Sequence, residues 1–244
     1  MRQGGTGILY EDTVLREPEP ALFAATTWAD APVAPGYSGG RGATRFIGHE
    51  GRQWVLRHYH RGGIVGRLLN DQFLWLGEAH TRCFREWRLL ARLGELGLPA
   101  PVPVAAHYRR SPPGYYVADL LTARIPDVEP LSSRLARTTP GAGVWQAVGR
   151  CIAEFHRAGV YHADLTAHNL QIDVADRIFL LDFDRGRIRH DRRPWREANL
   201  ARLHRSLTKI SAPGPASPTV TFGERQWRWL LEGYAAGGGS VAPA

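Results

Sequence analysis

The chain has 244 residues, of which 43% are hydrophobic and 22% are charged, and its formal net charge is +8. This length suits one large domain or two small lobes around a cleft, and the composition excludes general disorder. The positive charge favours an anionic partner: a nucleotide, a nucleic acid or a phosphorylated membrane surface. Lys209 is the only lysine, so nearly all of this charge is arginine, a bias that a GC-rich genome would also produce.

Cysteine usage and hydropathy limit the cellular setting. Cys83 and Cys151 lack metal-ligand spacing and are expected to be reduced core thiols. The first residues, MRQGGTGILYEDTVL, lack the apolar core of a signal peptide. No apolar run approaches the ~20 residues that cross a bilayer, so any membrane association is expected to be peripheral.

The first third of the chain predicts strands around a glycine-rich turn. Strands are expected over residues 7–10, 43–47 and 53–59, and the turn contains Gly39, Gly40 and Gly42. Glycines at such a turn would let backbone N–H groups close over phosphates, which makes them candidate nucleotide-binding residues. An ordinary hairpin turn is the alternative interpretation.

Two charged residues extend this nucleotide-binding hypothesis. Alternation along the third strand places Arg57 where protein kinases carry a phosphate-binding lysine. The arginine guanidinium is a planar fork of N–H donors, whereas the lysine ammonium is a compact point charge. Apolar spacing predicts a helix over residues 78–94, in which Glu86 is the candidate partner of Arg57. The alternatives are an exposed strand arginine, an inactive kinase relative, and a surface pair between Glu86 and a neighbour on its helix.

The segment after Arg57 is rich in basic residues, among them His58, His60, Arg61 and Arg67. Such a run is usually a solvated face. Here glycines and aromatic residues interrupt it, so a second anion site is the competing hypothesis.

Further along, strands are expected over residues 102–108 and 115–121, followed by a hinge over residues 122–125. Apolar stripes predict helices over 144–158, 194–210 and 222–234. We therefore predict a small lobe with an N-terminal extension (1–122), a hinge and helical catalytic lobe (123–234) and a flexible tail (235–244).

Residues 161–187, YHADLTAHNLQIDVADRIFLLDFDRGR, carry the strongest signal. Apolar runs at 170–172 and 178–181 predict a hairpin, and its ends present His162, Asp164, Asn169 and Asp182. The pattern H-x-D-L-x-x-x-N followed by D-F resembles the catalytic loop and metal-binding motif of protein-kinase-like phosphotransferases. His162 is expected to brace the loop.

Phosphoryl transfer requires positioning and charge neutralisation rather than covalent chemistry. Asp164 is the candidate acceptor of the substrate hydroxyl proton, while Asn169 and Asp182 are candidate catalytic ligands of Mg²⁺, which prefers hard oxygen donors. Singly, Asp182 could cap a turn and Asn169 could be a strand-edge amide. Their joint order with the glycine-rich turn, Arg57 and Glu86 predicts an α+β, bilobal protein-kinase-like fold. Its small lobe would be an antiparallel sheet with one helix, and its second lobe mainly helical.

The segments GGRGAT, VLRHYHRGG, GLPAPVPVAA, HADLTAHN and LLDFDRGR resemble the 3-deoxy-D-manno-octulosonic acid (Kdo) kinases of the lipopolysaccharide kinase family, over most of residues 35–190. The resemblance implies ATP- and Mg²⁺-dependent phosphorylation of the 4-hydroxyl of Kdo on a lipid A precursor. It also implies peripheral contact with the anionic cytoplasmic face of the inner membrane, and it makes Arg57 a family feature. Asp184 and Arg185 depart from the D-F-G pattern and, with the basic segment after Arg57, are candidate acceptor contacts.

Two alternatives remain open. One is a kinase of heptose or another small molecule, which would share every phosphotransfer motif. The other is a pseudokinase or basic binding module, suggested by Arg57 and the scarcity of lysine. A nucleic-acid partner is not expected, because the basic residues are dispersed and no such motif is present, and no obligate protein partner is evident.

Overall fold

A computed structural model describes residues 1–24, 26–28, 31–32, 44–49, 51–60, 71–189, 193–211 and 222–239. The chain forms two compact units. Unit 1 comprises Met1–Arg92 and Pro101–Ile125, and unit 2 comprises Leu93–Ala100 and Pro126–Ala244. The sequence predicted that the first lobe ends at residue 122, whereas the contacts place this boundary after Ile125 and also assign Leu93–Ala100 to unit 2.

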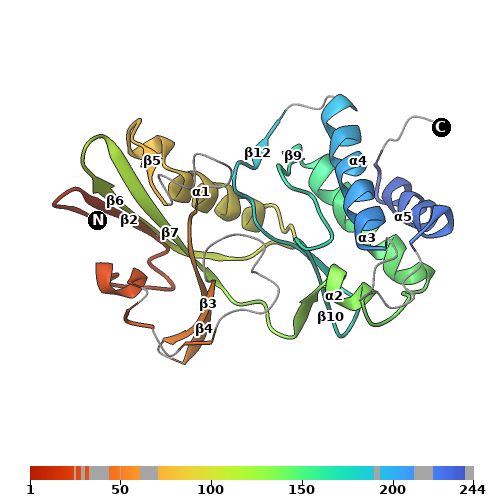
Figure 1. The fold of residues 1–244 in the computed structure, drawn as a ribbon, viewed down its shortest axis with the longest axis horizontal. Helices are drawn as coiled ribbons and strands as arrows, with labels where there is room; N and C mark the ends of the chain where they lie inside the picture. Colours follow the sequence, from red (N-terminus) through yellow and green to blue (C-terminus); the bar gives the residue numbers. More distant parts are fainter. Residues whose placement is uncertain are drawn as a thin grey trace. The chain divides into compact units, whose positions relative to one another are not determined.

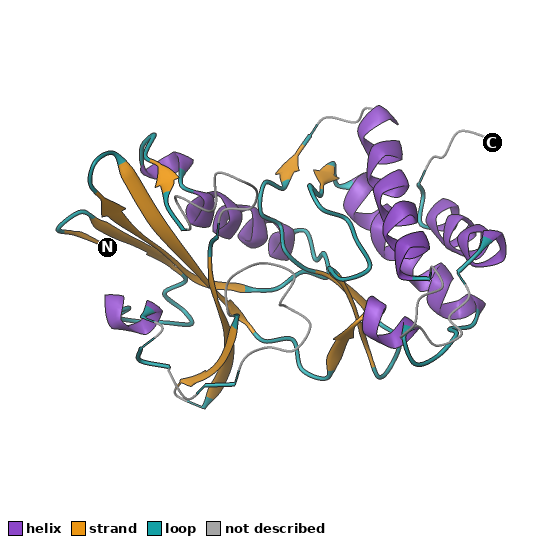
Figure 2. Ribbon diagram, in the orientation of Figure 1, coloured by secondary structure: helices purple, strands orange, loops and turns teal. Residues whose placement is uncertain are grey.

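Unit 1 is built on an antiparallel sheet (Figures 1 and 2). In the described residues its strands run in the order β1-β2-β6-β7-β4-β3, and β5 also pairs with β7. The strands are β1 (Arg2–Gln3), β2 (Thr6–Tyr10), β3 (Arg45–His49), β4 (Arg52–His58), β5 (Phe73–Leu74), β6 (Pro103–Ser111) and β7 (Tyr115–Ala123).

The two faces of this sheet are covered differently, because successive side chains of a strand point to opposite faces. On one face lies helix α1 (Arg82–Glu95), where Phe84 packs against Tyr108 and the backbone N–H of Arg82 donates to the Tyr116 hydroxyl. The 3₁₀ helix η1 (Pro20–Phe23) belongs to the core of the other face, together with buried side chains such as Leu56. A second 3₁₀ helix, η3 (Glu78–His80), precedes α1.

Unit 2 is mainly helical (Figure 2). Its helices are α2 (Leu131–Leu135), α3 (Ala142–Arg157), α4 (Arg193–Ile210) and α5 (Glu224–Ala236). Its short strands form two antiparallel groups: β8 (Val128–Pro130), β10 (Leu170–Asp173) and β11 (Ile178–Leu180) in one, and β9 (Val160–Tyr161) with β12 (Arg187–Ile188) in the other. No helix in the described part of the chain has the length and apolar character needed to span a bilayer.

The structure confirms the predicted α+β class and the expected helices and main strands, with ends that differ by a few residues. The short elements β1, η1, β5, β8, α2, β9 and β12 were not predicted. Residues 122 and 123, assigned to a hinge, continue β7, since Thr122 pairs with Val55 and Ala123 with Trp54. Helix α5 extends to Ala236, two residues into the predicted flexible tail, of which residues 240–244 lie outside the described residues.

Helices α3 and α5 approach each other closely through two glycines. A Cβ on Gly149 would lie 2.0 Å from the Leu230 carbonyl oxygen, and a Cβ on Gly233 would lie 2.1 Å from the Gln146 carbonyl oxygen. Backbone atoms cannot move away as a flexible side chain can. The packing of the two helices therefore depends on the absence of side chains at both positions.

We predict that Gly149→Ala lowers the free energy of unfolding by about 1–3 kcal/mol, the usual cost of overpacking. Urea denaturation followed by circular dichroism would measure the change. Gly143→Ala, in the same helix, is the matched control because a Cβ there meets nothing within 4 Å. Removing a helical glycine at that position should leave stability unchanged or raise it by up to about 1 kcal/mol. Equal effects of the two substitutions would contradict the packing argument.

Candidate active site

The predicted hairpin of unit 2 is formed by β10 and β11, which pair from Leu170 with Leu180 to Ile172 with Ile178. Beyond the last strand pair, the backbone N–H of Leu181 donates to the Asn169 carbonyl oxygen at 2.8 Å. This bond places the residue before Asp182 directly beside Asn169. The local geometry therefore brings the two candidate Mg²⁺ ligands to the same end of the hairpin.

His162 is buried and connects the loop before β10 with the chain after β11. Its Nε2 lies 2.9 Å from the Leu181 carbonyl oxygen, and its Nδ1 accepts the Asp164 backbone N–H at 3.1 Å. Burial is the main influence on this imidazole and lowers its pKa, which favours the neutral ring. These contacts give His162 the bracing position expected from the sequence.

Asp164 presents its carboxylate to solvent, with 57% of the side chain exposed. Its backbone is held in place, because Asn169 donates from Nδ2 to the Asp164 carbonyl oxygen at 2.8 Å. Asn169 thus ties the two ends of the 164–169 loop together. A fixed backbone with an accessible carboxylate is the arrangement that a proton acceptor for an external hydroxyl requires.

Asp182 has a left-handed backbone conformation, with φ of 61°. Aspartate is among the few residues that tolerate this region, and such conformations gather at functional sites. The backbone N–H of Asp184 lies 3.5 Å from the Asp182 carboxylate, at the limit of a hydrogen bond. Arg185 is exposed and also left-handed, at φ 61°.

The donor set fits Mg²⁺ bound together with a nucleotide. In the described residues, no group of three or more His, Cys, Asp or Glu side chains could hold a metal ion. Mg²⁺ in phosphotransferases is usually held by one or two carboxylates together with substrate phosphates and water. Asp182 and Asn169 would supply the protein oxygens of such a site.

Helix α4 holds the 162–167 loop at three points that the sequence analysis missed. Asn199 accepts from the His162 backbone N–H at 3.2 Å and donates to the His162 carbonyl oxygen at 2.8 Å. Ser206 accepts from the Ala167 backbone N–H at 3.2 Å. Between them, Arg202 Nη1 donates to Asp164 Oδ1 at 3.0 Å.

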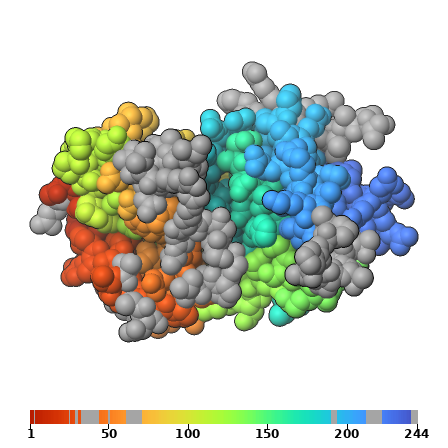
Figure 3. Space-filling model, viewed as in Figure 1, coloured from red at the N-terminus to blue at the C-terminus, as the bar shows by residue number. Residues whose placement is uncertain are grey.

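These three α4 residues are spaced i, i+3 and i+7, so they lie on one face of the helix. The apolar residues Leu200, Leu203 and Leu207 of α4 are buried. In Figure 3, α4 forms part of the visible surface beside the green and teal residues of unit 2. In the sequence, the signal for these contacts is a row of polar residues beside the apolar residues of the helix. That pattern does not show which loop the polar residues contact.

In unit 1, Arg57 on β4 and Glu86 on α1 form the predicted ion pair, with Nη2 and Oε2 2.5 Å apart. Tyr59 completes the group, since its hydroxyl donates to Glu86 and accepts from Arg57 at 3.2 Å. Burial, followed by the charge of Glu86, raises the pKa of Tyr59 well above its usual value. Glu86 is only 4% exposed, so this pair rigidly joins the helix to the sheet.

Other predicted residues cannot be placed. Gly39, Gly40 and Gly42 lie outside the described residues, as do Arg61 and Arg67. The structure therefore gives two local groupings of the candidate residues. Arg57 and Glu86 meet within unit 1, while Asp164, Asn169 and the chain at Asp182 meet within unit 2.

An arginine–glutamate pair linking a strand to a helix, with an H-x-D-L-x-x-x-N loop and a D-F motif on one hairpin, defines a protein-kinase-like phosphotransferase. Residues 26–234 match the model of the lipopolysaccharide kinase (Kdo/WaaP) family, and the chain belongs to that family. It is therefore a phosphotransferase that acts on a hydroxyl group, in the class of kinases that modify the lipopolysaccharide core.

Curated relatives confirm the predicted family. The chain is 44% identical over 208 residues to proteins named 3-deoxy-D-manno-octulosonic acid kinase from Xanthomonas campestris pv. campestris (strain B100) and Stenotrophomonas maltophilia (strain K279a). Each match covers 85% of this chain and 82% of the relative. A solved structure described as WaaP in complex with acyl carrier protein has a TM-score of 0.58 and 20% identity, covering 94% of this chain and 89% of that one, which supports the kinase-like fold.

We predict that Arg202→Gln lowers kcat roughly tenfold to hundredfold, because Asp164 loses the contact that orients its carboxylate. The KM values for both substrates should change little. The two side chains are 46% and 57% exposed, and exposed pairs contribute only about 0.2–1 kcal/mol. The melting temperature should therefore shift by no more than about 4 °C, as measured by thermal unfolding.

The matched control is Arg205→Gln on the same helix. Arg205 is exposed and makes no side-chain hydrogen bond or ion pair with the described residues. Both variants lose one positive charge, so a general electrostatic effect would lower both rates equally. Such a result, or full activity of Arg202→Gln, would exclude a specific role for the Arg202–Asp164 contact.

Proposed function

We propose that this protein transfers the terminal phosphoryl group of ATP to the 4-hydroxyl of a Kdo residue on a lipid A precursor. The observation that carries the proposal is the 44% identity over 208 residues to proteins named Kdo kinase. The family model matches residues 26–234, which include every candidate catalytic residue. The accessible carboxylate of Asp164 on a braced loop supports the same chemistry.

The transfer would proceed by direct displacement. The acceptor oxygen forms a bond to the γ-phosphorus as the bond between that phosphorus and the bridging oxygen of ADP breaks. Asp164 accepts the hydroxyl proton, and its fixed backbone aims the carboxylate. ADP leaves with the electron pair of the broken bond, so atoms and charges balance.

Negative charge on the phosphates would be neutralised by the protein and by bound Mg²⁺. Asp182 and Asn169 would hold Mg²⁺, which screens the phosphate oxygens when bound. Arg57 would bind phosphate oxygens of ATP, and Glu86 and Tyr59 fix the orientation of its guanidinium. Arginine presents several donors in a planar fork, which suits bidentate contact with phosphate.

The acceptor is an anionic glycolipid, and the proposed location is the cytoplasmic face of the inner membrane, with peripheral contact. The net charge of +8 supports this location, since basic proteins are attracted to anionic membrane surfaces. The same charge would favour association with the acidic headgroup of the substrate.

The direct test is mass spectrometry of a Kdo-bearing lipid A precursor incubated with purified protein, ATP and Mg²⁺. We expect a product heavier by one phosphoryl group and located on the Kdo 4-hydroxyl. Asp164→Asn and Asp182→Asn should each lower turnover by about 100-fold or more, since one loses the proton acceptor and the other a metal ligand. Asparagine tolerates the left-handed backbone at Asp182, so folding should be retained.

Asp176→Asn is the matched control, because Asp176 lies in the turn of the same hairpin and is also left-handed. It should retain near-normal turnover. If the protein phosphorylated heptose but not Kdo in a panel of acceptors, the Kdo proposal would be wrong and the heptose kinase alternative would be supported. A folded protein that transfers phosphate to no acceptor and shows no Mg²⁺-dependent nucleotide binding would support the pseudokinase alternative.

A further inference from the structure

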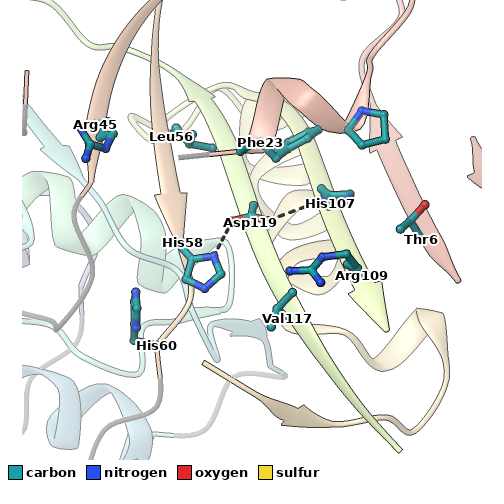
Figure 4. Close-up of a pocket in the computed structure, with 12 residues that line it drawn as sticks. Thr6, Phe23, Arg45, Leu56, His58, His60, His107, Arg109, Val117 and Asp119 are labelled. Atoms are coloured by element: carbon teal, nitrogen blue, oxygen red, sulfur yellow. Dashed lines mark hydrogen bonds and ion pairs between the residues drawn. The ribbon is translucent and has the colours of Figure 1, made fainter. Parts of the chain in front are cut away.

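A cavity of about 450 Å³ lies in unit 1, on the sheet face opposite the one that carries Arg57 (Figure 4). The alternation of β4 separates the two sites: Arg57 points to α1 and pairs with Glu86, while Leu56 and His58 line the cavity. Cavities of roughly 300–1,000 Å³ are typical of small-molecule sites. The cavity is therefore large enough for a ligand and separate from the Arg57–Glu86 pair.

One wall of the cavity contains a buried carboxylate shared by two imidazoles. Asp119 on β7 is 6% exposed, and its oxygens lie 2.6 Å from His58 Nδ1 and 3.1 Å from His107 Nδ1. Burial alone would raise the pKa of Asp119, but the hydrogen bonds from His107 and His58 outweigh it and lower the pKa. The surroundings of Asp119 thus favour its charged form.

His58 lies between two carboxylates on this wall. Burial opposes protonation, but the contacts with Asp119 and with Asp71, at 3.3 Å, raise the pKa of His58 above its ordinary value. Both ring nitrogens of His58 face carboxylates, so His58 offers no free hydrogen-bond donor to a ligand.

Three polar groups at the cavity, on Arg109, His107 and His60, lack a partner within the described part of the chain. Arg109 makes no side-chain hydrogen bond or ion pair there, and Figure 4 shows its guanidinium reaching from β6 across β7 toward His58. Nε2 of His107, a residue only 5% exposed, and Nδ1 of His60 are buried without a hydrogen-bond partner among the described residues. A buried polar atom left unpaired costs about 1–3 kcal/mol, so two of them on one wall indicate an incomplete site.

The rest of the cavity is apolar. Phe23 of η1 stacks on His107, with ring centroids 4.8 Å apart, and Leu56 and Val117 extend the same lining. An inorganic ion alone would leave these side chains uncovered. The lining fits a ligand with both an anionic group and an apolar body.

We propose that this cavity binds a small organic anion whose phosphate or carboxylate group pairs with Arg109 beside His58, and whose apolar body contacts Phe23, Leu56 and Val117. The proposal is independent of the substrate proposed above, because the site lies on the other face of the sheet from Arg57. Two residues of the basic segment after Arg57, His58 and His60, line the cavity, while Arg61 and Arg67 lie outside the described residues.

Isothermal titration calorimetry on the full chain tests the proposal with four probes: hexyl phosphate, hexanoate, hexanol and inorganic phosphate. We expect at least one of the two hexyl anions to bind with 1:1 stoichiometry, and about tenfold or more tightly than hexanol or inorganic phosphate. The tighter of the two anions identifies a phosphate or a carboxylate as the natural group. Binding should persist with ADP and Mg²⁺ present, which separates this cavity from the nucleotide site.

Two neighbouring arginines provide the matched variants. Arg109→Gln should weaken binding of the hexyl anion by about tenfold, and Arg109→Lys should retain most of it because the charge is kept. Arg110→Gln should change binding less than about twofold, since Arg110 lies over Trp75, with 5.1 Å between the guanidinium and the ring centroid, and does not line the cavity. Equal binding of hexanol and the anions, unchanged binding by Arg109→Gln, or no binding of either anion would overturn the proposal.

Discussion

The neutral imidazole of His162 holds the candidate active site of unit 2 together. Only the tautomer with a proton on Nε2 satisfies both of its contacts, since that nitrogen must donate to the Leu181 carbonyl oxygen while Nδ1 accepts the Asp164 N–H. Burial lowers the pKa of His162 and so maintains this state. A protonated ring would bring a second N–H against a backbone N–H. The positions of Asp164 and Asp182 therefore both depend on one buried, uncharged side chain.

Helix α4, which lies outside the β10–β11 hairpin, holds His162 and its loop in place. Asn199 satisfies both backbone groups of His162, so the loop cannot move without breaking two buried hydrogen bonds. Arg202 then acts on the side chain of Asp164 itself. Backbone placement and side-chain orientation are thus controlled by different residues of one helix, three positions apart.

The sequence predicted the fold and these catalytic groups because their signals are local. The motif residues around Asp164 lie within eight positions, and the helices have clear apolar periodicity. The contacts of α4 join residues 37–39 positions apart, and nothing local specifies such pairing. The cavity beside His58 could not be predicted from the sequence either. Alternation shows that His58 faces away from Arg57, but only the register of β6, β7 and β4 brings His107, Asp119 and His58 into one row.

The same register explains how one small sheet carries separate clusters of basic and acidic side chains on its two faces. His58 pairs with Asp119 across the strands, and His107 pairs with Asp119 from the other side. This directly cross-strand row of three polar residues points to one face of the sheet, so the Asp119 carboxylate can contact both imidazoles without reaching the face of Arg57. On that other face, Glu86 plays the corresponding part for Arg57. Each cluster therefore has its own buried carboxylate, so that adjacent positions on β4 can hold basic side chains on opposite faces of the sheet.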